Sequence, residues 1–450
     1  MRTILWDITS RCNMRCKHCY NVNYLNNSEL IYTQEELEQI FKNMEDLNVK
    51  KICFLGGEPT ISQNIVNAIN IGSQKKLNIS ITTNGQFFSE EFWNCIINDK
   101  VDEIIFSVEG ISSSTNDAIR GEGSLEKTLK NVKKMVYEKK RLNLKTKIFF
   151  SFTVNKLNYT ETPYFIKFAS DLEIDGVLIS KIDIEGAAIS NKKSLEITTS
   201  EYIDAIEMLV DSHQLYTHIY LEIVCKKRLI DYLKLKYTLT NCYKNETDSV
   251  CNGVDQEFYI DTLGRIFPCR RFKEEIKVNN LKKIKTISRS TFNEILNADY
   301  LTDFYRFTRN ISNYKINNFC KKCKFSSICK PCPYIKHFIP YECIEVEKRY
   351  QTYMYNLLSK KLALSNKILV NSLYDNTIKF YDQFTEFYYK IDRDSYEAIK
   401  EISTESTISE GLKKYYNKNN LSTCVAYQDF VKDYLEFLCD LYKLKIINFE

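Results

Sequence analysis

Three closely spaced cysteines constrain this chain more than any other feature of its sequence. Cys12, Cys16 and Cys19 follow a short apolar run at residues 3–6 with the spacing C-x3-C-x2-C. Three thiolates can hold three irons of a [4Fe–4S] cube and leave the fourth iron open for a ligand. A structural zinc site is the alternative, but zinc usually takes four ligands, and His18 is wedged between two of the cysteines. The spacing therefore favours an iron–sulfur cluster with an open position.

This cysteine stretch resembles the signature of the radical S-adenosylmethionine superfamily. The resemblance implies that the open iron binds the amino and carboxylate groups of S-adenosylmethionine. An electron from the cluster would cleave the sulfonium and yield a 5′-deoxyadenosyl radical, which abstracts hydrogen from a substrate. His18 stands where relatives usually carry an aromatic residue. The resemblance implies that this residue lies near the adenine.

Length and composition set the broad class of the protein. At 450 residues the chain is long enough for roughly three domains. Its 44% apolar and 27% charged residues are ordinary for a globular protein, and a net charge of +5 does not argue for a nucleic-acid partner. We find no signal-peptide core and no apolar run that could span a membrane, so we expect a cytoplasmic protein. Its 16 cysteines then argue for metal binding over disulfides.

Residues 1–215 alternate between apolar strands and amphipathic helices, which predicts an α/β domain with a parallel sheet. We expect strands at 3–8, 51–55, 78–82, 103–107, 147–154 and 176–182. We expect helices between and after them at 33–48, 61–76, 89–98, 124–140, 160–172 and 199–214. Six such units suit a partial (β/α)6 TIM-like barrel, which the family resemblance also implies. Its chemistry should lie at the C-terminal ends of the strands.

A glycine pair and an acid follow the second expected strand. Gly56 and Gly57 would let the backbone approach a ligand closely, and Glu58 could accept a hydrogen bond from an ammonium group. Taken alone, these residues are equally consistent with a turn that exposes an acid. After the cysteine loop they resemble the GGE motif of the superfamily, which holds the amino group of S-adenosylmethionine.

Polar residues also follow the third and fourth expected strands. Asn84 ends the third strand, Ser107 and Glu109 end the fourth, and Arg120 comes in a segment that resembles the RG stretch of peptide-modifying relatives. The resemblance implies that Ser107 and Arg120 contact the methionine carboxylate, a role that suits a guanidinium. A solvated surface arginine is the alternative. The candidate cofactor-binding residues are therefore His18, Gly56, Gly57, Glu58, Asn84, Ser107, Glu109 and Arg120; no catalytic acid or base stands out.

Residues 240–350 are rich in cysteine and follow a linking segment at 216–239. Residues 257–269 predict a hairpin around Gly264. Together the cysteines resemble a SPASM domain, which binds two auxiliary iron–sulfur clusters; a zinc ribbon is the alternative. The seven cysteines are Cys251, Cys269, Cys320, Cys323, Cys329, Cys332 and Cys343.

The SPASM resemblance also implies how these cysteines are shared between two clusters. One cluster would be held by Cys320, Cys323, Cys329 and Cys343, and the other by Cys251, Cys269 and Cys332. Cys242 could supply the fourth ligand of the second cluster, or that iron could stay open for substrate. With the three-cysteine loop, the chain is expected to carry three [4Fe–4S] clusters.

Residues 351–450 predict a helix followed by a third, small α+β domain. We expect strands at 367–371, 377–381 and 386–391 and helices at 394–402, 407–417 and 427–442. This order resembles a winged-helix RiPP recognition element, similar to the peptide chaperone of pyrroloquinoline quinone biosynthesis, which binds a leader peptide along a strand edge. Residues 366–450 carry 11 basic and 14 acidic side chains, whereas a DNA-binding winged helix is normally basic. A plain dimerisation module is the other alternative.

These features together predict a radical S-adenosylmethionine maturase of a ribosomally made precursor peptide. The peptide would bind through its leader, and flavodoxin or ferredoxin would supply electrons. Thioether formation, carbon–carbon cross-linking and epimerisation are all compatible with the sequence. One rival is a sulfatase-type maturase, but those relatives carry an acid where this chain has Arg270. The other is a non-catalytic iron–sulfur regulator with a winged helix, against which the acidic third domain and Glu58 speak.

Overall fold

The computed structural model describes most of the chain as two compact units. The described residues are 2–237, 242–244, 251, 253–275, 284–309, 318–322, 341–364, 369–372, 377–381, 388–423, 425–444 and 446–449. The first unit comprises Met1–Lys227 and Leu239–Glu342, and the second comprises Arg228–Thr238 and Cys343–Glu450. None of the helices in the described ranges combines the length and the apolar character needed to cross a membrane.

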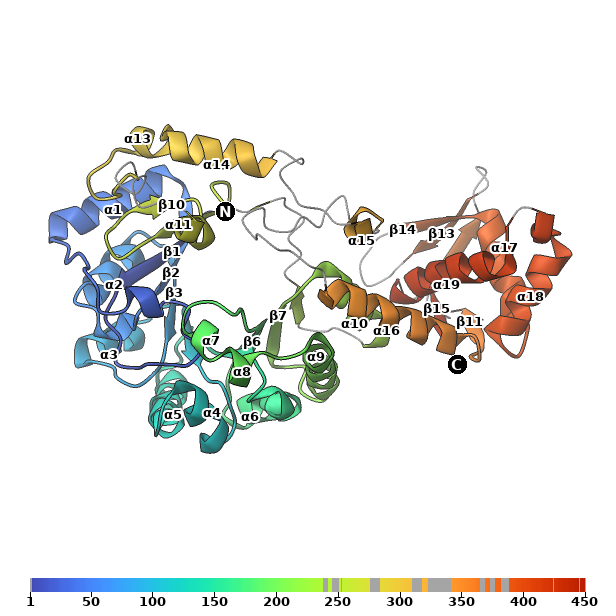
Figure 1. Ribbon diagram of the computed structural model, residues 1–450, viewed down its shortest axis with the longest axis horizontal. Coiled ribbons are helices and arrows are strands. Elements are labelled where there is room, and N and C mark those ends of the chain that lie inside the picture. The colour runs from blue at the N-terminus through green and yellow to red at the C-terminus, as the bar shows by residue number, and fades with distance from the viewer. Residues whose placement is uncertain are drawn as a thin grey trace. The chain divides into compact units, whose positions relative to one another are not determined.

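The first unit is built on one largely parallel sheet (Figure 1). Strands β1 to β8 follow one another across it, and each is parallel to the next. These strands are β1 Arg2–Thr9, β2 Val49–Gly56, β3 Asn78–Thr83, β4 Glu103–Ser107, β5 Lys147–Val154, β6 Gly176–Lys181, β7 Tyr220–Val224 and β8 Cys242–Lys244. The expected α/β fold with a partial barrel is therefore confirmed, and all six predicted strands are present.

The helices of the first unit flank the strands in the predicted places (Figure 1). They include α1 Gln34–Asp46, α2 Ile65–Gln74, α3 Glu90–Ile97, α5 Ser124–Leu142, α6 Thr162–Asp171 and α9 Thr199–His213. Helix α4, Ser113–Arg120, was not predicted, because only Ala118 and Ile119 among its eight residues are apolar and they show no helical period. Its start is nevertheless marked by Ser112, whose side chain accepts a hydrogen bond from the Thr115 amide.

Alternating side chains on β1 explain how the strand separates core from site. Trp6 is fully buried and packs on Phe41 of α1 and Phe54 of β2, with ring centroids 6.3 and 5.7 Å apart. Residues two apart on a strand share a face, so Asp7 and Thr9 point to the opposite side. The helix-facing side of the sheet is thus an aromatic and aliphatic core.

The parallel sheet continues beyond residue 215, the expected end of the barrel domain. The segment at 216–239, expected to be a linker, contributes β7 and helix α10, Lys227–Lys236. The strand forms because Leu221 and Ile223 alternate with more exposed residues and bury completely. This part of the chain is therefore largely regular structure.

The described part of the cysteine-rich segment joins the same sheet. The predicted hairpin is present: β9, Glu257–Ile260, pairs antiparallel with β10, Ile266–Phe267, and Gly264 in the turn has a φ of 68°. Strand β9 also pairs in parallel with β1, which the sequence did not predict. Helices α11 Arg270–Glu275, α13 Phe292–Leu296, α14 Asp299–Arg309 and α15 Asn318–Lys321 follow.

The second unit contains three antiparallel strands followed by three helices, in the predicted order. Strand β13, Thr377–Tyr381, lies between β12, Leu369–Ser372, and β14, Tyr388–Asp392. Helices α17 Arg393–Ser403, α18 Ile408–Lys418 and α19 Tyr427–Lys443 come next, with η5 at Leu421–Thr423. The unit also contains most of α16, Tyr341–Leu357, and a small sheet in which β11, Leu362–Leu364, pairs with β15, Ile447–Phe449. Glu386 and Phe387, predicted to begin the third strand, lie outside the described residues.

Candidate active site

A cavity of about 140 Å³ lies where β1 to β4 end. It brings together the three cysteines of the loop after β1 and residues that follow β2, β3 and β4. Its lining consists of Cys12, Met14, Cys16, His18, Cys19, Tyr20, Asn21, Leu55, Gly56, Gly57, Glu58, Thr82, Thr83, Asn84, Ser107 and Arg120. Ten of the eleven residues predicted for this end of the sheet, the three cysteines included, are therefore in one cavity; Glu109 is behind its wall.

The cysteine loop is held in place by contacts from distant parts of the chain. The Glu29 carboxylate accepts hydrogen bonds from the Thr9 hydroxyl and the Ser10 amide, each at 2.6 Å. The Ala187 amide, just after β6, donates to the carbonyl of Cys19 at 2.9 Å. The three thiols therefore start from a fixed backbone rather than from a free loop.

The pKa values and the arrangement of the three thiols in this loop bear on the kind of metal centre that they can hold. Burial raises the pKa of Cys12 to about 11 and also raises the pKa of Cys16 and of Cys19. Since iron is bound by the thiolate, loading this site must release protons. Within the described ranges, no three His, Cys, Asp or Glu side chains converge on a single ion. A four-iron cube holds each thiolate on a different iron, so it suits three cysteines that line one cavity without meeting at a point.

The glycine pair allows two segments of backbone to pack closely. A Cβ on Gly57 would lie 2.0 Å from the carbonyl oxygen of Arg11, and one on Gly56, with φ at 127°, would lie 2.4 Å from that of Thr9. The amide of Gly57 donates to the Thr9 carbonyl at 2.8 Å. The glycines therefore let β2 close against the start of the cysteine loop. Both line the cavity, but backbone packing alone requires them.

Glu58 is a buried acid in a full set of hydrogen bonds. It is 1% exposed, which excludes the alternative of a turn that exposes the acid. One carboxylate oxygen accepts from the hydroxyls of Thr60 and Thr83, at 2.8 and 2.6 Å, and the other accepts from the Asn84 amide at 2.7 Å. Burial raises the pKa of Glu58, while these hydrogen bonds lower it. They also fix the carboxylate at the cavity wall, where it can accept from a cation.

Glu109 links two residues that line the cavity. Its carboxylate is 3.3 Å from Nε2 of His18 and 3.5 Å from the guanidinium of Arg120. The Thr153 amide donates to its other oxygen at 2.7 Å. Glu109 is 2% exposed. It therefore orients the His18 ring and the Arg120 side chain from behind.

Two buried nitrogen atoms at this cavity are without hydrogen-bond partners among the described residues. They are Nδ1 of His18 and Nε of Arg120. Burying a polar group without a partner is costly, so such atoms at a cavity point to a missing polar ligand. Arg120 is 7% exposed and is not the solvated surface arginine of the alternative reading. With the three thiols and Glu58, the donor set fits a cluster-bound ligand that carries an amino and a carboxylate group.

Asn84 connects the end of β3 to the cysteine loop. Its side-chain amide donates to the Asn13 side chain at 2.7 Å. Ser107, at the end of β4, lines the cavity beside it. Met14, Tyr20, Asn21, Leu55, Thr82 and Thr83 also line the cavity and were not predicted. They adjoin the predicted motifs, so their nearness in sequence was the one available signal.

The structure describes only part of the predicted auxiliary ligand set. Cys251 and Cys269 flank the β9–β10 hairpin, and Cys320 lies in α15. Cys343 is buried in α16 and belongs to the second unit. Cys242 begins β8. Cys323, Cys329 and Cys332 lie outside the described residues.

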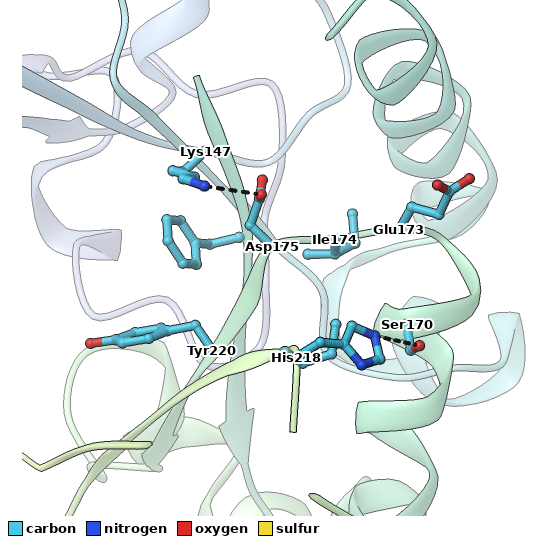
Figure 2. Close-up of a pocket in the computed structure, with 9 residues that line it drawn as sticks. Lys147, Ser170, Glu173, Ile174, Asp175, His218 and Tyr220 are labelled. Carbon is cyan, nitrogen blue, oxygen red and sulfur yellow. Dashed lines mark hydrogen bonds and ion pairs between the residues drawn. The ribbon is translucent and has the colours of Figure 1, made fainter. Parts of the chain in front are cut away.

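A larger hollow of about 550 Å³ lies at the opposite ends of β5, β6 and β7 (Figure 2). Lys147 begins β5 there, and its ammonium is 3.6 Å from the carboxylate of Asp175, just before β6. His218 shares a hydrogen bond with Ser170 at 3.1 Å. None of the sequence motifs falls in this hollow, and parallel α/β folds carry their chemistry at the C-terminal strand ends. The smaller cavity is therefore the candidate active site.

Two family models match this chain. Residues 6–169 match the Radical SAM superfamily, and residues 251–324 match the SPASM iron–sulfur cluster-binding domain. The first match begins within β1, extends past β5 and includes all the predicted cofactor residues. The second begins at Cys251 and includes the hairpin and Cys320.

Curated relatives and solved structures agree with these matches. The PqqA peptide cyclase of Bradyrhizobium diazoefficiens is 21% identical over 267 residues, which cover 59% of this chain and 66% of that protein. A tungsten-containing aldehyde ferredoxin oxidoreductase cofactor-modifying protein of Pyrococcus furiosus is 23% identical, over 73% of this chain and 89% of that protein. SuiB of Streptococcus suis, bound to S-adenosylmethionine, has a TM-score of 0.58 and 16% identity, with 75% of each chain covered. SuiB has also been solved with its precursor peptide SuiA.

Proposed function

We propose that this chain, which carries a radical SAM domain followed by a SPASM domain, modifies a ribosomally synthesised precursor peptide by radical chemistry. The observation that carries the proposal is the cavity at the ends of β1 to β4. It joins three cysteines, a buried acid and a buried arginine in one small space. That donor set suits a cluster with an open iron and an amino-acid ligand on it.

Several residues of the cavity then have a proposed role. Cys12, Cys16 and Cys19 would hold three irons of a [4Fe–4S] cluster, and Glu58 would accept from the amino group of S-adenosylmethionine. Arg120, beside Ser107, would hold its carboxylate, and His18 would lie near the adenine. Once bound and reduced by one electron, this cofactor supplies a carbon radical that removes hydrogen from a substrate. A flavodoxin or ferredoxin would deliver that electron.

The SPASM segment would hold two auxiliary clusters. Cys251, Cys269, Cys320 and Cys343 belong to this proposed set, together with Cys323, Cys329 and Cys332. We assign these clusters to the enzyme because the family model for the segment is that of an iron–sulfur cluster-binding domain. Three clusters per chain is our proposed content.

The second unit is proposed to recognise the leader of the peptide, as a RiPP recognition element does. Strand β14 is at one edge of the three-stranded sheet in the described part of the unit. Half-buried aromatic side chains at i, i+3, i+7 and i+10 run along α19: Tyr427, Phe430, Tyr434 and Phe437. A free strand edge offers main-chain hydrogen bonds to an extended peptide, and aromatic side chains offer pockets for its anchors.

A peptide substrate is supported by the relatives as well. PqqA peptide cyclase and SuiB are both named or solved with peptides, and both resemble this chain. We propose that the product is a thioether or another cross-link. A cross-link formed after hydrogen abstraction removes two hydrogens from the peptide. One would leave as the hydrogen atom taken by the 5′-deoxyadenosyl radical, and the other as a proton whose electron would pass to one of the proposed auxiliary clusters.

Co-expression with the short peptides encoded beside the gene tests this function. The intact chain should convert one of them to a species lighter by two hydrogens in high-resolution mass spectrometry. The variant Cys12→Ala/Cys16→Ala/Cys19→Ala is the matched control and should leave the peptide unchanged. Equal modification by this variant would refute the radical mechanism, and no modification of any of these peptides by the intact chain would refute the substrate assignment.

A further inference from the structure

A network of buried polar side chains lies beside the cavity, and its acid, Asp7, does not line the cavity. Asp7 of β1 is 1% exposed, and one of its carboxylate oxygens accepts hydrogen bonds from Asn21 at 3.1 Å and from the Tyr259 hydroxyl at 2.5 Å. Asn21 is two residues beyond Cys19, whereas Tyr259 belongs to β9 of the cysteine-rich segment. Asp7 thus joins two segments that are far apart in sequence.

The polar network continues from Tyr259 to the helix that follows Cys269. The ammonium of Lys273, in α11, donates to the Tyr259 hydroxyl at 3.3 Å and lies 3.9 Å from the ring centre of Tyr24. Helix α11 starts directly after Cys269, whose sulfur accepts from the Phe272 amide at 3.4 Å. The polar network therefore extends from the neighbourhood of Cys19 to that of Cys269.

A second contact reinforces the same junction. The guanidinium of Arg270 lies 4.0 Å from the ring centre of Tyr20, the residue after Cys19. The same arginine is 3.5 Å from Glu185, which follows β6. Two cations in the first four residues of α11 thus lie over the rings of two tyrosines that follow Cys19, an arrangement that attracts a cation to the ring face.

Packing alone does not account for a carboxylate at Asp7. Burying an acid costs free energy, and well-packed apolar residues often serve stability as well or better. Burial raises the pKa of Asp7, while its hydrogen bonds and the nearby Lys273 and Arg270 lower it. Its second oxygen is without a hydrogen-bond partner among the described residues. Its hydrogen bonds with Asn21 and Tyr259 provide a directional link between two cysteine-bearing segments.

We propose that Asp7, Tyr259 and Lys273 are positioning residues that fix the three-cysteine loop against the helix after Cys269. Through them, the geometry of the cavity depends on the cysteine-rich segment as well as on the barrel strands. The role rests on the proposed function only in taking Cys19 and Cys269 as cluster ligands. Neither an altered peptide substrate nor a different bond formed would change it.

Hydrogen exchange of the metal-free protein tests this role without cofactor or peptide. Tyr259→Phe removes the hydroxyl that bridges Asp7 and Lys273, and Lys273→Met removes the last link. Each should speed amide exchange in residues 16–24 by about tenfold, the loss expected for one charge-assisted hydrogen bond. The control is Tyr300→Phe, which removes a phenol that bonds the Ile266 carbonyl at 2.8 Å in the same segment but does not touch Asp7.

In the double variant Tyr259→Phe/Lys273→Met, amide exchange in residues 16–24 should be no faster than in either single variant, because one change already interrupts the polar network. In the reconstituted protein, both single variants should shift the reduction potential of the three-cysteine cluster, and Tyr300→Phe should not. Exchange in residues 16–24 that equals the control in both variants would overturn the proposal. Should Tyr259→Phe fail to fold, Lys273→Met, at the end of the polar network, tests the proposal alone.

Discussion

Glu58 and Arg120 are the side chains on which cofactor binding should depend most. Glu58→Gln keeps the shape of the acid and removes its charge, and Arg120→Gln removes the guanidinium. Each should weaken S-adenosylmethionine binding by about 1.5–3 kcal/mol, the worth of one hydrogen bond to a charged group. Anaerobic calorimetry on the reconstituted protein measures this directly.

The matched control for Glu58 is Glu161→Gln. Glu161 also accepts from a backbone amide, that of Ile111 at 2.7 Å, and from the hydroxyls of Ser112 and Thr115, but it does not line the cavity. Its change should leave the dissociation constant untouched. If all three variants bind the cofactor as tightly as the unaltered chain, the cavity is not its site.

Sequence motifs located the cavity residues but not what each one does there. Glu58 and Arg120 could be predicted because they stand in short motifs after strands. The contacts of Glu109 with His18 and Arg120 could not be predicted, because they depend on how side chains extend across the cavity wall. Asp7 gave no signal at all, since its partner Tyr259 is 252 residues away in the chain.

At the scale of elements, the end of β2 packs tightly against the start of the cysteine loop. Gly57→Ala would push a methyl group against the carbonyl of Arg11, a backbone atom that cannot step aside. We expect a loss of about 1–3 kcal/mol in unfolding free energy, or more, together with loss of iron from the three-cysteine site. Urea unfolding and iron analysis on the same preparation measure both.

Gly72→Ala in α2 is the comparison for this change. Its methyl group would meet only the tips of the Ile79 and Phe41 side chains, at 3.1 Å, and a helix interior favours alanine. Iron content should stay unchanged in that variant. Full iron retention in Gly57→Ala would show that the β2 closure does not shape the cluster loop.

Helix α19 carries the prediction on leader binding. Phe430→Ala and Tyr434→Ala remove half-buried aromatic side chains from the row on α19 that is proposed to anchor the leader. Each should weaken binding of a synthetic leader peptide by roughly 1–3 kcal/mol, as for aromatic anchors at other interfaces. Fluorescence anisotropy of a labelled leader reports the change. Asp429→Ala, a change at an exposed residue of the same helix, is the control. Equal affinities in all three variants would show that the aromatic row on α19 does not bind the leader.

Most elements could be predicted because their periods are long enough to read. The six barrel strands and the helices between them follow from alternating and helical apolar patterns. Helix α4 was missed because its sequence is mostly polar, and the pairing of β9 with β1 was missed because parallel partners far apart in sequence share no turn. Turn chemistry did predict the hairpin at Gly264, whose positive φ suits glycine.

For the whole molecule, the proposed content is three clusters. Anaerobic reconstitution should give about twelve irons per chain, from three cubes of four. The variant Cys12→Ala/Cys16→Ala/Cys19→Ala should keep about eight of them and lose all cleavage of S-adenosylmethionine. A preparation that binds zinc in place of iron would contradict the account of all three sites.

The structure also shows how the second unit must be tested. A deletion from residue 366 would leave β11 without its partner β15 and would split a unit that includes residues 228–238 and α16. Loss of peptide modification by such a truncated chain could then reflect misfolding. Point changes on α19 disturb less, because the buried residues Leu435 and Leu438 stay in place. Since Phe430 and Tyr434 also pack on Tyr415 of α18, the circular dichroism of each variant must first match that of the unaltered chain.

The central claim is that this enzyme takes hydrogen from a peptide, and isotope transfer tests it most directly. The peptide found by co-expression is prepared in fully deuterated form and incubated anaerobically with reconstituted enzyme, S-adenosylmethionine and a reductant. Mass spectrometry of the 5′-deoxyadenosine formed then reports the source of its new hydrogen. We predict one deuterium per molecule in step with peptide modification. Modified peptide accompanied by 5′-deoxyadenosine without deuterium would contradict the claim.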